Sequence, residues 1–380
     1  MYQFDAERTR SLKNYHLLYL CVFLLLGIGL VTLYSASYSS ATRLYSNGNH
    51  FIIRQLQMAV PGLVLFFILS KIDLEKYRKF SFALVVVAAV LCVATFIPGI
   101  GIERNGASRW IKIGSGSYQP SEFVKFALPL YLAHLLDKKS NNIDNISNVL
   151  TPVIVTGVFF ALIYKQNNFS TAVFIVFNAL VIFFLAGMRL RYFFSAVLVT
   201  IPISVILVFT EIHRVKRLVS YLRPEWDPRD AGLQVNASRD AIVSSGFWGA
   251  GVGEGTRKIA GIPEIHSDFI FSAYIEETGF LGFILFFALF SVFAFLGYRT
   301  AWRCKNIFYK LLAAALTTMI VSQVLLNVAV VSGALPATGI PLPFFSAGGS
   351  SLLTTLICAG LICNAARKEN EEKAIEGGRI

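Results

Sequence analysis

The residues best suited to chemistry lie in the segment PEIHSDFIFSAYIEETGF, residues 263–280. Asp268 stands directly before an apolar run, and a carboxylate at the edge of an apolar cavity has a raised pKa that suits a general base. Asp268, Ser272 and Glu276 recur every four residues, so on a helix they share one face and could line a polar groove. A structural role is also open, because Ser267 or Asp268 could cap the helix that follows.

Residues 104–125, RNGASRWIKIGSGSYQPSEFVK, could complete such a site. Arg109 and Lys112 are cations, and the amphipathic ring of Trp110 suits a membrane surface. Such cations could bind phosphate or pyrophosphate groups while an attached lipid tail stays in the bilayer. These residues therefore indicate a lipid-linked anionic substrate, but they do not name the reaction.

Other polar residues in apolar surroundings have structural interpretations. Glu122 and Lys125 are three residues apart at the start of a helical pattern, so we expect them to pair with each other. Residues 335–351, LPATGIPLPFFSAGGSS, are rich in proline and glycine and predict a non-helical loop that is buried in protein or lines a cavity. In the apolar run before it, Gln323 and Asn327 could link neighbouring helices.

The elements that must position these residues are membrane helices. The chain has 380 residues, of which 55% are hydrophobic and 15% charged, whereas about a quarter of a soluble protein is charged. Several apolar runs reach the roughly 20 residues that cross a bilayer. We predict ten spans, at about 17–36, 55–70, 80–98, 120–136, 149–164, 169–187, 191–210, 272–297, 308–332 and 348–366. The sequence thus predicts an all-α polytopic membrane protein with one membrane domain over residues 1–380.

The positions of Lys and Arg predict the orientation of these spans. With the N-terminus inside, the inner segments hold 19 Lys and Arg residues and the short outer loops hold 6. The loop 211–268 holds 8, but long loops cross membranes largely regardless of charge. We therefore expect the tails 1–16 and 367–380 in the cytoplasm and a large extracytoplasmic loop, 211–268, between the seventh and eighth spans. This bias accounts for the net charge of +12, so we expect no nucleic-acid partner.

The loop 211–268 starts with an amphipathic basic segment. Its cationic side chains are His213, Arg214, Lys216, Arg217 and Arg223. This segment fits either a helix at the membrane interface or a surface helix with a solvated face. The later alternating glycines, from Gly249 to Gly255, are interpreted as loop glycines that let backbone approach a neighbour, because no strand precedes them. The cysteines lack metal-ligand spacing, so no metal site is expected among them.

Four motifs in the same order resemble the SEDS family, the FtsW/RodA cell-wall polymerases. They read RWIKIG…YQPSEFVK, R…DP…G.Q…S…AI..SG…G.G.G across 223–255, PEIHSDFIF…EE.GF.G, and P.TGIPLPF.S.GGSS. The likeness covers roughly residues 17–366. It implies a ten-helix glycosyltransferase of the bacterial cytoplasmic membrane, which polymerises lipid II with inversion and releases undecaprenyl pyrophosphate.

The resemblance also implies roles for individual residues. The family's essential aspartate falls on Asp268, which would act as the catalytic base, and its tryptophan falls on Trp110. The expected substrate-binding residues are Arg109, Trp110, Lys112, Arg257, Lys258, His266, Glu276 and Ser350. Glu122 and Lys125 are expected to be structural. A divalent cation, Mg²⁺ or Mn²⁺, would be bound together with the pyrophosphate, because the chain offers no metal motif of its own.

Some positions depart from the family pattern, and alternatives remain open. Asn168 replaces a carboxylate in QNNFSTA, and Ala347 replaces a tyrosine in SAGGSS. YSAS at 34–37 favours the division branch, FtsW-like, whereas the GIPLPF stretch leans toward the elongation branch, RodA-like; we favour division. The resemblance implies a class B penicillin-binding transpeptidase and other divisome proteins as partners at the septum. A lipid II flippase and a non-catalytic scaffold are the alternative functions.

Overall fold

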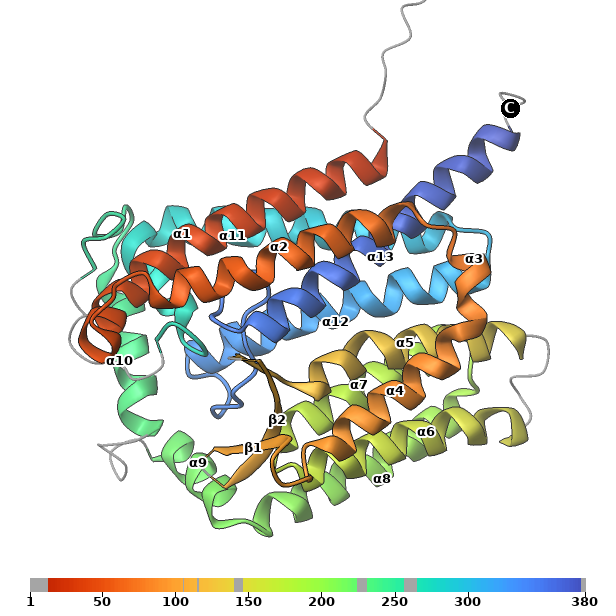
Figure 1. Ribbon diagram of the computed structural model, residues 1–380, viewed down its shortest axis with the longest axis horizontal. Helices are drawn as coiled ribbons and strands as arrows, with labels where there is room; N and C mark the ends of the chain where they lie inside the picture. Colours follow the sequence, from red (N-terminus) through yellow and green to blue (C-terminus); the bar gives the residue numbers. More distant parts are fainter. Residues whose placement is uncertain are drawn as a thin grey trace, which may run out of the picture.

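The computed structural model describes residues 13–104, 106–114, 116–139, 146–223, 231–255 and 265–376, and it is mostly helical (Figure 1). The longer helices are α1 (Asn14–Tyr45), α2 (His50–Lys71), α4 (Ser81–Ala94), α5 (Pro120–Lys138), α6 (Ile146–Lys165), α7 (Phe169–Leu185), α8 (Leu190–Phe209), α11 (Ile270–Arg303), α12 (Ile307–Val331) and α13 (Gly349–Glu376). Shorter ones are α3 (Leu74–Tyr77), α9 (Ile212–Leu222) and α10 (Ala231–Ser244).

Each of the ten predicted apolar ranges coincides with one of the longer helices. Six of the described helices, namely α1, α2, α8, α11, α12 and α13, are long and apolar enough to cross a membrane. Apolar parts of α6 and α7 are shorter. The chain is therefore a multi-pass helical membrane protein. In Figure 1 the start of α1 and the end of α13 lie at one end of the molecule, and the sheet, α9 and α10 lie at the other.

The prediction of an all-α protein is wrong for the loop 99–119. This loop folds into a three-stranded antiparallel sheet of β1 (Gly101–Arg104), β2 (Ala107–Ile113) and β3 (Gly116–Tyr118). The turn glycines Gly106 and Gly114 have φ of 73° and 56°, a left-handed conformation that glycine adopts without strain. The strands are three to seven residues long and rich in glycine and serine, so their alternation is too short to stand out in the sequence.

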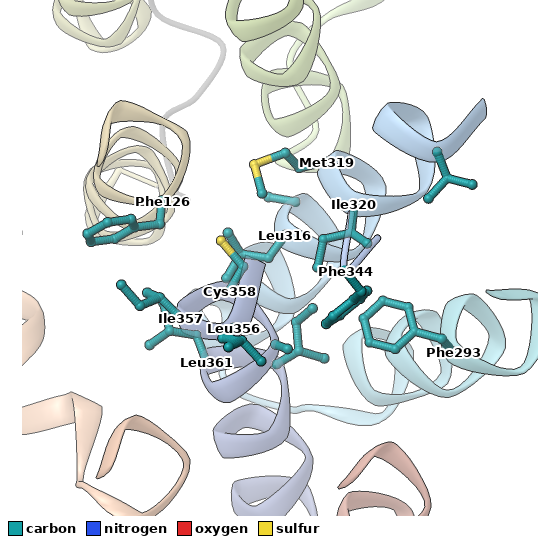
Figure 2. Close-up of a cluster of buried hydrophobic side chains, with 14 of the residues drawn as sticks. Phe126, Phe293, Leu316, Met319, Ile320, Phe344, Leu356, Ile357, Cys358 and Leu361 are labelled. Atoms are coloured by element: carbon teal, nitrogen blue, oxygen red, sulfur yellow. The ribbon is translucent and has the colours of Figure 1, made fainter. Parts of the chain in front are cut away.

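The core of the bundle is built around α12 and α13. In the most apolar stretch of each helix, 83% of the residues of α13 and 61% of those of α12 are buried. In the corresponding stretch of α8, no residue is buried. Figure 2 shows Phe344, from the loop between α12 and α13, beside Phe293 of α11, with side chains of α12 and α13 in the same cluster and Phe126 of α5 on its far side. The close approach of α13 to α2 depends on Gly360, where a Cβ atom would lie 2.8 Å from the Phe66 carbonyl oxygen. The two helices that flank the loop 332–348 are thus the most buried of the six helices that are long enough to cross a membrane.

Helix α11 is interrupted near its N-terminal end. Gly279 has φ 64° and ψ −159°, which is not helical. The glycine-rich segment before α11 fills this break. Four backbone hydrogen bonds join the two segments, from the N–H groups of Ala250, Gly251, Phe280 and Leu281 to the carbonyl oxygens of Glu276, Glu277, Gly246 and Phe247. Non-helical backbone within a membrane protein needs such internal partners. A Cβ on Gly279 would lie 2.3 Å from the Gly249 nitrogen, so both glycines are needed for the contact.

Candidate active site

Asp268 lies in the short loop directly before α11, and it is half-buried. Helix α11 begins at Ile270 after Phe269, so neither Ser267 nor Asp268 occupies the N-cap position. The Ser267 hydroxyl donates to Asp268 Oδ1 at 3.2 Å. The capping interpretation is therefore wrong, because neither the Ser267 nor the Asp268 side chain caps the start of α11.

A single side chain of α12 joins the loop of Asp268 to the proline-rich loop. Asn327 Nδ2 donates to the main-chain oxygens of Asp268 and Ile340, both at 2.9 Å. Gln323, one turn earlier, donates to the Pro341 carbonyl at 2.8 Å. The sequence predicts that these amides link helices. Gln323 does so, because its Oε1 accepts a hydrogen bond from Lys125 of α5 at 3.4 Å, whereas the Nε2 of Gln323 and the Nδ2 of Asn327 donate to carbonyls of non-helical backbone.

The two loops are also joined directly. Ser346 Oγ donates to the Ser267 carbonyl at 2.5 Å, and the Ala347 N–H donates to the His266 carbonyl at 2.8 Å. A Cβ on Gly339, which has φ 70°, would lie 3.5 Å from Asp268 Oδ2. The proline-rich loop therefore passes beside the Asp268 carboxylate and fixes its position.

Next to this loop lies a hollow of about 390 Å³, which we call the basic hollow. It is lined by Arg109, Asn167, Asn168, Phe169, Ser170, Val205, Val208, Phe209, His213, Arg214, Arg217, Leu218, Pro336, Ala337 and Thr338. Three arginines and a histidine thus face apolar residues of α8. The first residues of α7 also line it, and the positive end of a helix dipole favours anions.

Arg109 is the member of the basic hollow that is electrostatically linked to Asp268. Burial, followed by repulsion from Arg217, lowers the pKa of Arg109 to about 10, while Asp268 acts to raise it. Arg109 is therefore still a cation at neutral pH. The pKa of His213 is lowered by burial and by Arg217 and Arg214, so this imidazole is neutral at neutral pH.

The two arginines of α9, Arg214 and Arg217, differ in burial and in their contacts. Arg214 is buried, and its Nη1 donates to the Leu207 carbonyl at 2.8 Å and to the Tyr164 hydroxyl at 3.2 Å. It fastens α9 to the ends of α6 and α8. Arg217 is exposed, and its contact with the Ala337 carbonyl is long, at 3.5 Å. Arg217 is thus the more available cation.

The other predicted residues of β2 are on the opposite face of the strand from Arg109. Trp110 lies under the guanidinium of Arg104, 5.4 Å from its ring centre, and Lys112 is exposed beside its partner residue Ser117 in β3. Side chains alternate between the faces of a strand, and neither residue lines the basic hollow. The structure therefore brings Arg109, but not Trp110 or Lys112, to the hollow.

Three more predicted substrate-binding residues lie apart from the basic hollow. His266 is buried against Phe51 with ring centres 3.9 Å apart, and burial lowers its pKa to about 4, so it is not a cation at neutral pH. Glu276 is buried beside Gly255. Ser350 Oγ accepts the Gln119 N–H at 3.1 Å. Arg257 and Lys258 lie outside the described residues.

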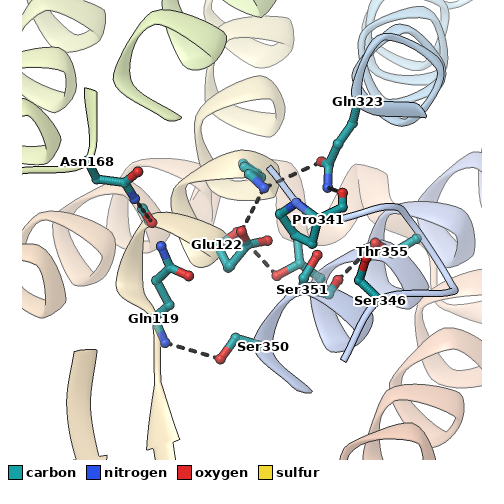
Figure 3. A network of polar contacts seen from close by, with 12 residues as sticks. Gln119, Glu122, Asn168, Gln323, Pro341, Ser346, Ser350, Ser351 and Thr355 are labelled. Carbon is teal, nitrogen blue, oxygen red and sulfur yellow. Dashed lines mark hydrogen bonds and ion pairs between the residues drawn. The ribbon is translucent and has the colours of Figure 1, made fainter. Parts of the chain in front are cut away.

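The predicted partners Glu122 and Lys125 form a buried ion pair (Figure 3). Lys125 Nζ lies 2.6 Å from Glu122 Oε1, and the two side chains are 2% and 4% exposed. Lys125 also donates to Gln323 Oε1 at 3.4 Å, and the Thr354 hydroxyl donates to the Glu122 carbonyl at 3.2 Å. The pair connects α5 to α12 and α13, which places it among the structural contacts behind the site.

Residues that the sequence reasoning did not assign to the site are Arg214, Arg217, Asn167 and Asn327. The basic, amphipathic pattern of 212–222 was the signal for the arginines, but it did not reveal which groups the basic face meets. Within the described part of the chain, no group of three or more His, Cys, Asp or Glu side chains could hold a metal ion.

The fold and the site define a multi-pass membrane protein in which a carboxylate and a cation-lined hollow share one end of a helical bundle. Comparison with known proteins then identifies the group: the chain belongs to the FtsW/RodA/SpoVE family, described as cell cycle proteins, whose profile matches residues 15–371.

Relatives over nearly the whole length support this membership. The probable peptidoglycan glycosyltransferase FtsW of Trichlorobacter lovleyi is 37% identical over 348 residues, which is 91% of each chain. The stage V sporulation protein E of Bacillus subtilis is 37% identical over 352 residues, 92% of this chain and 96% of that protein.

Solved structures share the fold. A chain of a peptidoglycan synthase complex, studied for how polymerization and crosslinking are coordinated, has a TM-score of 0.77 and 25% identity over 93% of this chain and 97% of that chain. The rod shape determining protein RodA of Thermus thermophilus has a TM-score of 0.69 and 24% identity, over 93% and 96%.

Proposed function

We propose that this protein is a peptidoglycan glycosyltransferase of the division branch, which polymerises lipid II into glycan strands and releases undecaprenyl pyrophosphate. The observation that carries the proposal is the placement of the half-buried Asp268 beside a hollow with three arginines. A proton acceptor and a site for a polyvalent anion are the two parts that glycosyl transfer from a lipid pyrophosphate requires.

In the proposed reaction Asp268 accepts the proton of the C4 hydroxyl of the acceptor GlcNAc. The oxygen forms a bond with C1 of the donor MurNAc, and the bond from C1 to the pyrophosphate oxygen breaks with inversion. The pyrophosphate leaves as an anion, so it needs neutralisation more than a proton. Arg109 and Arg217 supply positive charge in the basic hollow, and the start of α7 adds its dipole.

An apolar cavity of about 530 Å³ lies between α6, α7 and α8. Val199, Thr200 and Ile203 of α8 line it, and the next residues of the same helix, Val205 and Val208, line the basic hollow. The two spaces therefore follow each other along α8. This arrangement suits an anionic head group in one space and a polyprenyl chain in the other.

The predicted Mg²⁺ or Mn²⁺ has no cage among the described residues, because Asp268 is not accompanied by two further metal-binding side chains. Pyrophosphate oxygens would have to provide most of the ligands for such an ion. The proposed mechanism uses only the charges of the protein.

The function is tested by replacing Asp268 with asparagine, which has nearly the same shape and cannot accept a proton as a base. We expect a folded protein whose polymerisation of purified lipid II falls by about 10² to 10⁴. Gel-resolved glycan product is the measurement, with thermal stability as the control for folding. Near-normal polymer from this variant would favour the flippase or scaffold alternatives.

We also propose ten membrane spans, cytoplasmic termini and an outer location for the sheet, α9 and α10. All five native cysteines are buried, so they should react little and a single introduced cysteine can be labelled selectively. Ser117→Cys and Val243→Cys should react with an impermeant thiol reagent in intact cells, and Lys76→Cys only after permeabilisation. The reverse labelling pattern would show that the proposed orientation in the membrane is wrong.

The partners follow from the proposed reaction and from the family. Newly made glycan strands need crosslinking, so the protein is proposed to work with a class B penicillin-binding transpeptidase and other divisome proteins at the septum of the bacterial inner membrane. Co-purification of the full-length protein with such a transpeptidase, and polymerisation assays with and without it, would test this association.

A further inference from the structure

The turn between α6 and α7 is held in place by two flanking side chains. Gln166 is fully buried, and its Nε2 donates to the Cys92 carbonyl at 3.0 Å and to Thr95 Oγ1 at 3.2 Å. Asn168 Nδ2 donates to Ser121 Oγ at 3.4 Å. The turn is thus fixed to the end of α4 and the start of α5, so the residue between them has a well-defined place.

That residue, Asn167, has a left-handed backbone with φ 59°. Asparagine accepts this conformation better than most residues. Its side-chain Nδ2 donates to the Gly106 carbonyl at 2.7 Å, in the turn between β1 and β2. The main-chain carbonyl oxygen of Asn167 accepts a hydrogen bond from Arg109 Nη2. One residue therefore holds both the sheet and the guanidinium that the sheet carries.

The surroundings of Arg109 disfavour its positive charge, so a hydrogen bond that holds its guanidinium in place is important. Its Nε is buried and has no hydrogen-bond partner among the residues that the structure describes. Arg217 and Arg214 lie close enough to repel its charge. Asp268 attracts this charge, and among the described residues the main-chain carbonyl of Asn167 accepts a hydrogen bond from the guanidinium, so it restrains where the guanidinium points. A hydrogen bond between a charged and a neutral group is also stronger than one between neutral groups.

We propose that Asn167 is a positioning residue, which uses its left-handed backbone to hold Arg109 toward the basic hollow so that it can bind the pyrophosphate of a polyprenyl-linked substrate. The proposal rests on the proposed function for the identity of the anion. Asn167 acts through Arg109, so it should affect affinity for the anion more than the chemical step at Asp268.

The test measures binding of undecaprenyl pyrophosphate to the full-length protein in nanodiscs, together with KM and kcat for lipid II. Asn167→Ala removes the bond to Gly106 and disfavours the left-handed turn, and we expect affinity to fall about tenfold, in line with loss of a hydrogen bond to a charged group. KM should rise similarly with little change in kcat. Asn167→Gly keeps the left-handed backbone and should lie between this variant and the wild type.

Ser46 offers a matched control because it also has a left-handed backbone, with φ 52°, at the end of α1, and it does not line the basic hollow. Ser46→Ala should carry a similar backbone strain without changing affinity. A second test combines Asn167→Ala with Arg109→Ala. If Asn167 acts through Arg109, the double variant should bind no more weakly than Arg109→Ala alone.

The outcomes separate this inference from the proposed function. Wild-type affinity and KM in Asn167→Ala, or independent losses that multiply in the double variant, would overturn the positioning role. A wild-type protein that binds undecaprenyl pyrophosphate through Arg109 but makes no polymer would refute the polymerase function and leave the role of Asn167 standing.

Discussion

Two charged regions lie close to the candidate active site, and their charges are arranged in opposite ways. At the start of α5, Glu122 and Lys125 are almost fully buried and pair at 2.6 Å. In the basic hollow, Arg109, Arg214 and Arg217 gather on one surface, and the two α9 arginines repel Arg109.

The difference separates charges that hold the protein together from charges that are arranged for a ligand. A buried charge is costly unless an opposite charge compensates it, and Glu122 and Lys125 meet this condition within the protein. A cluster of like charges opposes folding, and beyond the attraction between Asp268 and Arg109 it gains further compensation when an anion binds. The predictions that follow test this division, beginning with the largest expected effect.

Breaking the Glu122–Lys125 pair should have the largest effect on stability. Lys125→Met leaves Glu122 buried beside no opposite charge, so we expect a loss of about 3–5 kcal/mol. Replacing both residues, with Glu122→Gln and Lys125→Met, should recover much of it. Thermal unfolding in detergent and the yield of folded protein are the measurements. A double variant as unstable as the single one would mean that this pair does more than balance two charges.

Arg217 should affect substrate binding without affecting stability. Arg217→Ala removes an exposed cation of the basic hollow, and we expect KM for lipid II to rise about tenfold, as for loss of one contact to a charged group. Lys216→Ala is the matched control, because Lys216 is an exposed cation of the same helix that does not line the hollow. Equal kinetics for the two variants would contradict the assignment of the hollow.

His266 should make the protein sensitive to acid because it is buried without taking up charge. Burial lowers its pKa from 6.5 to about 4, so the unfolded chain binds the proton more readily, and stability falls as the pH drops from 6.5 toward 4. At pH 5 the loss should be about 2 kcal/mol. Unfolding midpoints at pH 7.5 and 5 measure it. His266→Gln should remove most of this difference. His213→Gln should remove a smaller part of it, because the pKa of the half-exposed His213 is also lowered in the folded protein.

The smallest effect is expected at the outer face of β2. Lys112 is exposed and Trp110 contacts Arg104 rather than the basic hollow. Lys112→Ala and Trp110→Phe should therefore change KM by less than about twofold, as surface substitutions usually do. Arg109→Lys should raise KM more, because lysine cannot reproduce the planar guanidinium. Kinetics on purified lipid II decide between them, and a Trp110 effect as large as that of Arg109 would move the site to this face.

Features that depend on local composition were predictable from the sequence, and features that depend on contacts between distant segments were not. The apolar runs gave the long helices, and residue type with local pattern singled out Asp268, Arg109 and the Glu122–Lys125 pair. The basic face of 212–222 was visible in the sequence, but its proximity to Arg109 depends on the turn between the end of α8 and the start of α9. The bridge made by Asn327 could not be foreseen either, because it joins residues 59 and 13 positions away.

The join between the glycine-rich segment and the break in α11 has a consequence for mutational scanning. Its four hydrogen bonds run from main chain to main chain, so no side chain along it donates or accepts them. A scan that replaces side chains with alanine would pass over most of the join without registering it. The glycines are the exceptions: a methyl group on Gly249 or Gly279 would meet backbone at 2.3 Å, and Gly246 and Gly251 have positive φ, which alanine adopts only with strain. A tolerant profile across this region would therefore hide one of the most demanding pieces of geometry in the protein.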